Sequence, residues 1–345
     1  MNGLDGALAW SERGLEIIDQ TKLPHDVQIL HIESMDQLRD AIDRLAVRGA
    51  PALGAVGALG VVVALDQASR ERWADARLAL EVDALRSARP TAVNLAWGVD
   101  QVRPHVPHGR AAVLAAALAI VEADQRGNRT MGRLGADFLE ACLPARPLRL
   151  LTHCNSGALA TTGWGTGLGV IKELAARGRI DHVLVDETRP LLQGSRLTAW
   201  ELAGADIEHA VIPDSAAAGL ILAGRVDAVV IGADRIAANG DTANKVGSVG
   251  LALAAADAGI PFVVAAPEST IDAATSDGSA IVVEARDEGE VLSFAGSRVA
   301  PAGSRAVNPA FDVTPVRLVT VIVTDVRTIN TARGECPVER AEAAR

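Results

Sequence analysis

The amino-acid sequence predicts an α/β protein. A C-terminal, Rossmann-like, doubly wound and mostly parallel sheet is expected to follow a smaller N-terminal domain of β-hairpin or meander plus helices. Two observations predict this arrangement. From Leu148 onward, short apolar runs alternate with helical stretches, a rhythm typical of a parallel sheet covered by helices. Before Leu148, a short β-like segment leads into a long alanine-rich region with helical spacing.

The N-terminal region begins with short apolar runs separated by turn residues, which predicts a small β-hairpin or meander. Residues 34–45 then carry apolar side chains at helical spacing. The next predicted helix starts near Pro51, and a glycine at every third position lets another backbone approach closely; these glycines are Gly54, Gly57 and Gly60. Arg48 precedes this helix, so we expect it beside free backbone N–H groups, where an anion such as phosphate can bind.

Residues 67–125 are predicted to be helical, with breaks at residues 87–91 and 103–109. Arg89 therefore lies in a loop, either as a solvated charge or as part of a site. We place the domain boundary between about residues 125 and 147, before the strand–helix rhythm begins. The predicted domains are residues 1–130, a β-meander and helical domain, and residues 131–345, the Rossmann-like domain.

Most predicted strands of the C-terminal domain end in polar residues. The strand-end residues are Cys154, Glu187, Asp214, Asp234, Pro267 and Asp325. Ligands bind at the carboxyl ends of the strands in open α/β sheets, so these side chains should converge on one rim that holds a site. Taken alone, Asp234 would be interpreted as a solvated or capping carboxylate. Its position among several polar strand ends favours the interpretation that it belongs to a site.

The stretch from Asp227 to Ala256 is expected to form one corner of this rim. An apolar strand, residues 228–231, leads to Asp234, and a turn then passes through Asn244 and Lys245 into an alanine-rich helix. A carboxylate, an amide and an ammonium group should therefore lie together. Lysine is rare in this chain, whose other cations are arginines, which favours a specific use for a compact ammonium; codon drift is the alternative.

Cys154 ends the first strand of the C-terminal domain, in the motif THCNSGALAT. A helix expected from about Ala158 would stabilise its thiolate through the helix dipole; the alternative is a small buried hydrophobic side chain. His153 and Cys154 are neighbours on a strand, so their side chains should point to opposite faces and not form a nucleophile–base pair.

The segment DETRPLLQGSRLTAWEL, residues 186–202, follows the second strand. It is rich in hydrogen-bond donors that suit sugar hydroxyls and phosphate, and these are Thr188, Arg189, Gln193 and Arg196. Trp200 is predicted to pack in the core.

Composition argues against several classes of function. The net charge of -10 argues against general binding of nucleic acid or of an anionic membrane. No dinucleotide fingerprint, P-loop or metal-binding motif is present, so we expect no cofactor and no metal. Cysteines are sparse, and the N-terminus lacks a signal-peptide pattern, which predicts a cytoplasmic protein. The apolar run at residues 50–65 is shorter than the roughly 20 residues of a membrane span and is predicted to be a buried helix.

Six motifs occur in a fixed order along the chain: RGAPALG, RPTAVNL, THCNSGALAT, DETRPLLQGSRLTAWEL, GADRIAANGDTANKVGS and NPAFDVTPVRL. In sequence and order they resemble the aldose-ketose isomerase family of methylthioribose-1-phosphate isomerase, up to about Val326. The wider family includes ribose-1,5-bisphosphate isomerases and regulatory subunits of a translation initiation exchange factor. The resemblance implies a two-domain homodimer of methionine salvage that converts 5-methylthioribose 1-phosphate to 5-methylthioribulose 1-phosphate.

The resemblance also implies roles for individual residues. Cys154 and Asp234 match the family's catalytic pair. The substrate-binding positions are matched by Arg48, Gly49, Ala50, Arg89, Gln193, Asn244 and Lys245. One residue departs from the family pattern, because Ala216 in PDSAAAG stands where the family commonly has methionine. This departure predicts more room near the 5-substituent of the substrate.

The implied reaction suits these residue types. Phosphate on the anomeric oxygen blocks ordinary opening to a free aldehyde, so hydrogen must move from C2 to C1 with the phosphate attached, through either a phosphate-bearing enol or a hydride shift. An Asp234 with a raised pKa is suited to protonate the ring oxygen or to shuttle the C2 hydroxyl proton, with Cys154 as the second acid–base group. The alternatives are an isomerase of 5-deoxyribose 1-phosphate or ribose 1,5-bisphosphate, and a non-catalytic regulatory binding protein.

Overall fold

The computed structural model describes residues 6–89 and 93–338 of the chain. It begins, as predicted, with an antiparallel meander of three strands in the order β1-β2-β3. These strands are β1 (Leu8–Ser11), β2 (Gly14–Ile18) and β3 (Ile29–Ile32). Leu15 and Ile17 point to the same face of β2 and are fully buried, so they pack the meander against the helices that follow.

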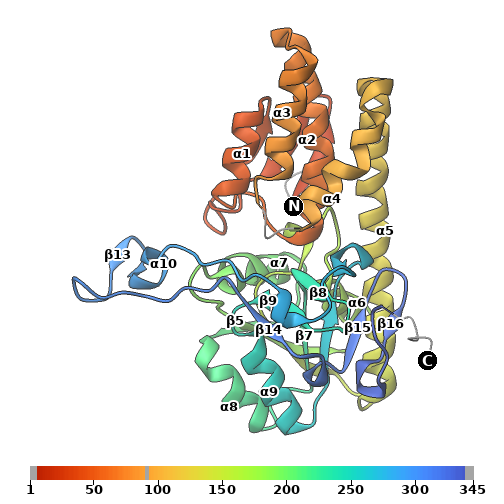
Figure 1. Ribbon diagram of the computed structural model, residues 1–345. Helices are drawn as coiled ribbons and strands as arrows, with labels where there is room; N and C mark the ends of the chain where they lie inside the picture. Colours follow the sequence, from red (N-terminus) through yellow and green to blue (C-terminus); the bar gives the residue numbers. More distant parts are fainter. Residues whose placement is uncertain (1–5, 90–92, 339–345) are drawn as a thin grey trace, which may run out of the picture.

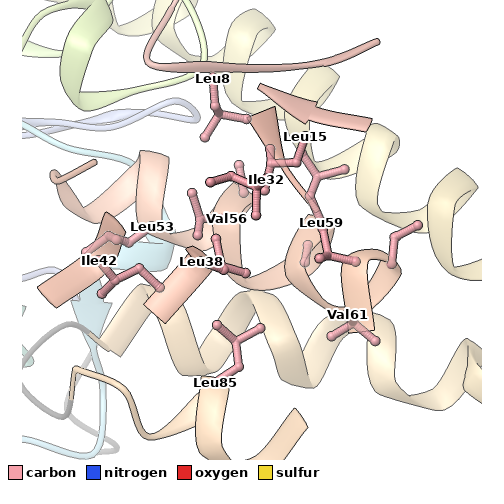
Figure 2. Close-up of a cluster of buried hydrophobic side chains, with 14 of the residues drawn as sticks. Leu8, Leu15, Ile32, Leu38, Ile42, Leu53, Val56, Leu59, Val61 and Leu85 are labelled. Atoms are coloured by element: carbon pink, nitrogen blue, oxygen red, sulfur yellow. The ribbon is translucent and has the colours of Figure 1, made fainter. Parts of the chain in front are cut away.

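Five helices follow the meander in the described part of the chain: α1 (Met35–Asp43), α2 (Ala50–Glu71), α3 (Asp75–Arg86), α4 (Val93–Val102) and α5 (Arg110–Cys142). Residues 90–92, in the predicted break and the RPTAVNL motif, lie outside the described residues. Figure 2 shows the apolar core that joins the meander to the helices, with labelled side chains Leu8, Leu15, Ile32, Leu38, Ile42, Leu53, Val56, Leu59, Val61 and Leu85.

Helix α2 lies at the centre of this N-terminal core. The predicted close approach at its glycines is confirmed, because a Cβ on Gly57 would lie 2.4 Å from the carbonyl oxygen of Leu95 in α4. In turn, a Cβ on Gly98 of α4 would lie 1.9 Å from the carbonyl oxygen of Gly54. Within the described residues, α2 alone has the length and apolarity of a membrane span, yet 72% of its most apolar window is buried inside the protein.

The C-terminal part is built on a seven-stranded sheet in the order β16-β15-β10-β7-β4-β5-β6. Neighbouring strands are parallel except for the edge strand β16. The strands are β4 (Leu148–Thr152), β5 (Ile180–Asp186), β6 (His209–Ile212), β7 (Ala228–Ile231), β10 (Phe262–Ala265), β15 (Val321–Val323) and β16 (Thr328–Ile329).

Helices cover both faces of this sheet (Figure 1). They are α6 (Gly167–Ala176), α7 (Ala199–Gly204), α8 (Ala217–Leu222) and α9 (Ser248–Ala258). Along β7, Val230 packs with α5, α6 and α7, whereas its neighbours Val229 and Ile231 pack with α8 and α9. Because consecutive strand residues face opposite sides, both faces of the sheet are buried, as the uninterrupted apolar runs predicted.

A smaller four-stranded sheet lies beside the main one, in the order β11-β8-β9-β14. Its strands are β8 (Arg235–Ala237), β9 (Thr242–Lys245), β11 (Ile271–Asp272) and β14 (Phe311–Thr314). The prediction that Asn244 and Lys245 lead directly into a helix is therefore wrong. They lie on β9, opposite Asp312 and Phe311 of the distant β14, and α9 starts only at Ser248.

Two further features of the fold are the long helix α5 and an extension of the chain. Helix α5 contributes Val113 and Ala117 to the N-terminal core and Met131 and Leu139 to the core under the sheet, so one continuous helix reaches both. Between β11 and β14 the chain forms an extension that projects from the body in Figure 1 and carries α10 (Gly289–Leu292), β12 (Ser293–Phe294) and β13 (Ser297–Arg298).

We predict that Gly57→Ala lowers the free energy of unfolding by about 1–3 kcal/mol, because the added methyl group forces α2 and α4 apart. Gly250→Ala is the matched control, since Gly250 lies in helix α9 with open space around it, and we expect a gain of up to about 1 kcal/mol there. Urea unfolding of both variants measures the difference. Equal effects at the two positions would contradict close α2–α4 packing.

Candidate functional site

Two adjoining pockets lie beyond the ends of β4 and β7, and both are lined by Arg48, Gly49, Ala50, Cys154 and Asp234. The first, here called the cationic pocket, has a volume of about 600 Å³ including the part open to solvent, and Arg89, Gln193 and Lys245 also line it. The second, here called the polar pocket, is lined by Asn244 and by several hydroxyl groups. The structure thus brings all nine predicted site residues to one place.

Cys154 follows β4 in a left-handed backbone conformation, with φ of 61°. Its N–H donates to Thr188 Oγ1 at 2.9 Å, and its carbonyl accepts from Thr198 Oγ1 at 2.6 Å. The expected helix at Ala158 is a single 3-10 turn, and α6 begins only at Gly167, so the prediction of helix-dipole stabilisation is wrong. Burial instead raises the pKa of the Cys154 thiol, against the opposing charges of nearby cations.

Asp234 lies between β7 and β8, where its backbone N–H donates to the carbonyl of Ala243 at 2.9 Å. Burial raises the pKa of the Asp234 carboxyl, whereas Lys245, Arg89 and Arg48 act in the opposite direction. The site therefore contains a carboxyl group that holds its proton to a higher pH than an exposed aspartate does.

Arg48 is buried and binds the residue that follows Cys154. Its Nη1 donates to the carbonyl of Asn155 at 3.0 Å, and its Nη2 donates to Asn155 Oδ1. Gly49 has φ of 94°, and a Cβ at that position would lie 2.6 Å from the carbonyl oxygen of Ala160. Only glycine therefore lets the start of α2 approach the loop after Cys154 this closely.

Asn155 is itself held by a buried ion pair. Its Nδ2 donates to Thr198 Oγ1 at 3.1 Å and to Glu201 Oε1 at 2.9 Å. The other oxygen of Glu201 accepts from Lys172 Nζ at 2.8 Å. Two of the chain's rare lysines are thus fixed at the site: Lys245 lines the cationic pocket, and Lys172 pairs with Glu201, which holds Asn155.

Lys245 and Gln193 present polar groups to the cationic pocket. Lys245 Nζ donates to the carbonyl of Ala310 at 2.8 Å and lies 4.7 Å from the ring centroid of Phe311. Burial lowers the pKa of Lys245, while the negative charges of Cys154 and Asp234 oppose this shift. Gln193 is 4% exposed, and within the described residues its Oε1 has no hydrogen-bond partner.

His153 does not pair with Cys154, in agreement with the sequence. Its Nδ1 lies 2.8 Å from Asp186 Oδ2, and its Nε2 lies 2.9 Å from the carbonyl of Val246. His153, Asp186 and Asp214 cluster closely enough to suggest metal ligands. However, both Asp214 oxygens accept backbone N–H groups at 2.7 Å, and both His153 nitrogens are engaged, so hydrogen bonding accounts for these two residues, whereas Asp186 Oδ1 has no partner among the described residues.

The model of the Initiation factor 2 subunit family matches residues 46–331. The chain belongs to this family.

Relatives extend the comparison over most of the chain. It is 45% identical to the methylthioribose-1-phosphate isomerase of Desulforudis audaxviator, over 95% of each chain. It is 52% identical to a Nocardia farcinica protein named "Probable bifunctional methylthioribose-1-phosphate isomerase/methylthioribulose-1-phosphate dehydratase", covering 93% of this chain and 58% of that protein's length.

Two solved structures share the fold. The 5-methylthioribose 1-phosphate isomerase of Pyrococcus horikoshii has a TM-score of 0.85 and 35% identity, covering 95% of this chain and 93% of that one. A structure from A. fulgidus, described as the delta subunit of translation initiation factor eIF-2B, has a TM-score of 0.82 and 37% identity, covering 96% and 97%. Relatives named as enzymes and as a translation factor thus share the family fold.

In this member of the family, three predicted donors serve the protein and not the pockets. Thr188 Oγ1 donates to the carbonyl of Asp186, and Arg196 donates to the carbonyls of Gln20 and Leu23. Arg189 donates to backbone carbonyls of Pro190, Glu290 and Val291. None of the three lines either pocket, because Arg189 and Arg196 tie the loop that presents Gln193 to the extension and to the N-terminal region.

Ala216 lies outside both pockets. It ends a short 3-10 turn, Asp214–Ala216. The expectation of more room near the 5-substituent stays a prediction.

The pockets contain further residues that the sequence did not single out. The cationic pocket is also lined by Leu45, Leu53, Leu191, Arg286 and Phe311. Leu191 and Phe311 lie within quoted motifs, so their motif positions were the only available signal. Arg286 lies in an irregular stretch without a recognisable pattern, and only tertiary contacts bring it to the site.

We predict that Asp234→Asn raises the free energy of unfolding more at pH 7 than at pH 4.5. A carboxyl with a raised pKa in the folded protein contributes stability that is complete below its unfolded pKa of about 3.9, and this stability is lost as the pH rises through the folded pKa. Asparagine carries no such dependence. Urea unfolding of both proteins at the two pH values checks this, and a difference independent of pH would contradict a raised pKa.

Proposed function

We propose that the chain converts 5-methylthioribose 1-phosphate to 5-methylthioribulose 1-phosphate. One observation of the site carries the proposal: a thiol and a carboxyl, those of the half-buried Cys154 and Asp234, line the cationic pocket together with three cations suited to phosphate. The relatives that bear the isomerase name support it, because this chain aligns with them over nearly its whole length.

Phosphate binding is assigned to Arg48, Arg89 and Lys245, together with the backbone at Gly49 and Ala50. The last two residues form the start of α2, whose free N–H groups and helix dipole favour an anion. The guanidinium groups suit the paired oxygens of phosphate, and the ammonium adds a compact charge. These charges are close enough to Asp234 to influence its pKa, so the phosphate and the acid–base group occupy one site.

Gln193 and Asn244 are assigned to the sugar hydroxyls. The buried Oε1 of Gln193 needs a donor, and a substrate hydroxyl supplies one. Asn244 lines the polar pocket and is held by a 2.9 Å bond from its Nδ2 to Ser248 Oγ, which leaves its Oδ1 to accept from a hydroxyl.

The acid–base chemistry is assigned to Asp234 and Cys154. In its protonated form Asp234 donates to the ring oxygen as the ring opens, and the resulting carboxylate accepts a proton from the C2 hydroxyl. Cys154 is the second proton-transfer group, and its raised pKa keeps the thiol protonated until substrate binds. Enclosure of the site by both parts of the chain limits the access of water to the intermediate.

The 5-substituent is assigned to the apolar side chains that line the cationic pocket. Leu45, Leu53, Leu191 and Phe311 provide carbon surface that suits a methylthio group. A second phosphate at that position would lose its hydration against these side chains, so the lining disfavours ribose 1,5-bisphosphate.

The proposal extends to the organisation of the protein. We assign residues 1–130 and 131–345 to an N-terminal and a catalytic domain, and we propose a cytoplasmic homodimer joined mainly through the catalytic domains. It needs no bound cofactor, because acid–base groups and fixed charges of the chain supply the chemistry.

We predict that Cys154→Ser and Asp234→Asn each lower kcat by at least about 10²-fold, because each removes a proton-transfer group. Near-native circular dichroism and unfolding curves would show that folding is retained. Turnover of 5-methylthioribose 1-phosphate is the measurement. Near-normal rates in both variants would remove the proposed pair, and absence of turnover in the native chain would favour a regulatory binding protein.

We also predict a preference of at least about tenfold in kcat/KM for 5-methylthioribose 1-phosphate over ribose 1,5-bisphosphate, which corresponds to the burial of one small apolar group. Parallel assays of the two substrates measure it, with 5-deoxyribose 1-phosphate as an intermediate case. Activity confined to the bisphosphate would overturn the assignment of the apolar lining.

A further inference from the structure

Arg286 is a fourth cation of the cationic pocket, and its position is set by the segment that leads into β14, the strand that pairs with β9. Its backbone N–H donates to the carbonyl of Asn308 at 2.9 Å, and the N–H of Ala310 donates to the carbonyl of Glu284 at 2.8 Å. Ala310 also accepts the hydrogen bond from Lys245 Nζ. The segment carrying Glu284 and Arg286 is therefore anchored beside Lys245 and precedes α10 in the chain.

Glu284 joins Arg286 to Arg89. Arg286 Nη1 donates to Glu284 Oε1 at 2.9 Å, while Arg89 Nη2 lies 3.5 Å from Glu284 Oε2. All three side chains are about one-fifth exposed. One carboxylate thus bridges two pocket-lining guanidinium groups, one from the N-terminal helical region and one from the extension. We call these three residues the arginine–glutamate bridge.

The bridge has an electrostatic cause. Four cations line the pocket and repel one another. Burial lowers the pKa of Lys245, and the positive charges of Arg89 and Arg286 lower it further. Glu284 offsets this repulsion at Arg89 and Arg286. Arg286 also pairs with Glu290, whose Oε1 accepts from Arg286 Nη2 at 2.5 Å, so Glu284 is the carboxylate that the two arginines share. A phosphate would bring oxygens of the same kind to the same guanidinium groups, and two anions at one pair of arginines repel each other.

We propose that Glu284 is an internal counter-anion that competes with the phosphate of the substrate for Arg89 and Arg286. Phosphate binding then displaces this carboxylate, starting at the longer contact to Arg89. The affinity for phosphate therefore depends on how strongly phosphate binds the two arginines relative to the Glu284 carboxylate that it replaces. The proposal rests on the proposed function for the substrate, but the anion is recognised by its chemistry alone, so inorganic phosphate is a sufficient probe.

The test is calorimetric titration of the full chain with inorganic phosphate. We expect Glu284→Gln to bind phosphate about fivefold more tightly than the native chain, because the competing charge is gone while the side chain keeps its size. Glu288→Gln is the matched control on the same extension. Glu288 pairs with the exposed Arg305, which lines neither pocket, so we expect unchanged phosphate affinity.

Unchanged or weaker phosphate binding by Glu284→Gln would overturn the proposal, since Glu284 would then only support the two arginines. Arg286→Gln provides a second variant on the solvent-accessible extension should Glu284→Gln fail to fold. We expect it to bind phosphate about fivefold more weakly, and unchanged binding would also overturn the proposal. Failure of the proposed isomerase activity is distinguishable, because it appears as absent turnover in a native chain that still binds phosphate.

Discussion

The arrangement of the site depends on the two hydrogen bonds from Arg48 to Asn155. Arg48 immediately precedes the central helix of the N-terminal core, and Asn155 follows Cys154 at the rim of the main sheet. The pair therefore fixes the start of α2 against the loop that carries the thiol. Gly49 makes the contact sterically feasible, and a displacement at this point would change both the cation and the helix N-terminus offered to phosphate.

The orientation of Asn155 depends in turn on Glu201. Every partner of this buried carboxylate is a donor: Asn155 Nδ2, the backbone N–H groups of Ala158 and Leu159, and Lys172 Nζ. A carboxylate suits four donors because it is an acceptor at both oxygens, whereas an amide would turn an N–H toward other N–H groups. Burial opposes ionisation, but Lys172 and these bonds lower the pKa of Glu201. Asn155 thus has its amide nitrogen fixed toward Glu201 and its oxygen toward Arg48.

The sequence predicted features that follow from short-range patterns. Buried strands appear as apolar runs, and their polar ends led directly to Cys154 and Asp234. The placement of Asn244 and Lys245 at a helix start was wrong because the turn at residues 239–241 joins two antiparallel strands, β8 and β9, and β9 also pairs with the distant β14. Arg286 was missed because only long-range contacts, hydrogen bonds to residues just before β14, bring it to the pocket.

The positions of these groups also explain how one pocket can bind an anion and retain a proton. The cations of the pocket favour the ionised forms of Asp234 and Cys154 and act to lower both pKa values. Burial acts in the opposite direction and outweighs the cations at both groups. Glu284 further opposes ionisation of Asp234 while it pairs with Arg89. A phosphate bound as proposed would bring negative charge to the same cations, weaken their pull on the protons and favour the protonated form of Asp234 to which the proposal assigns ring opening.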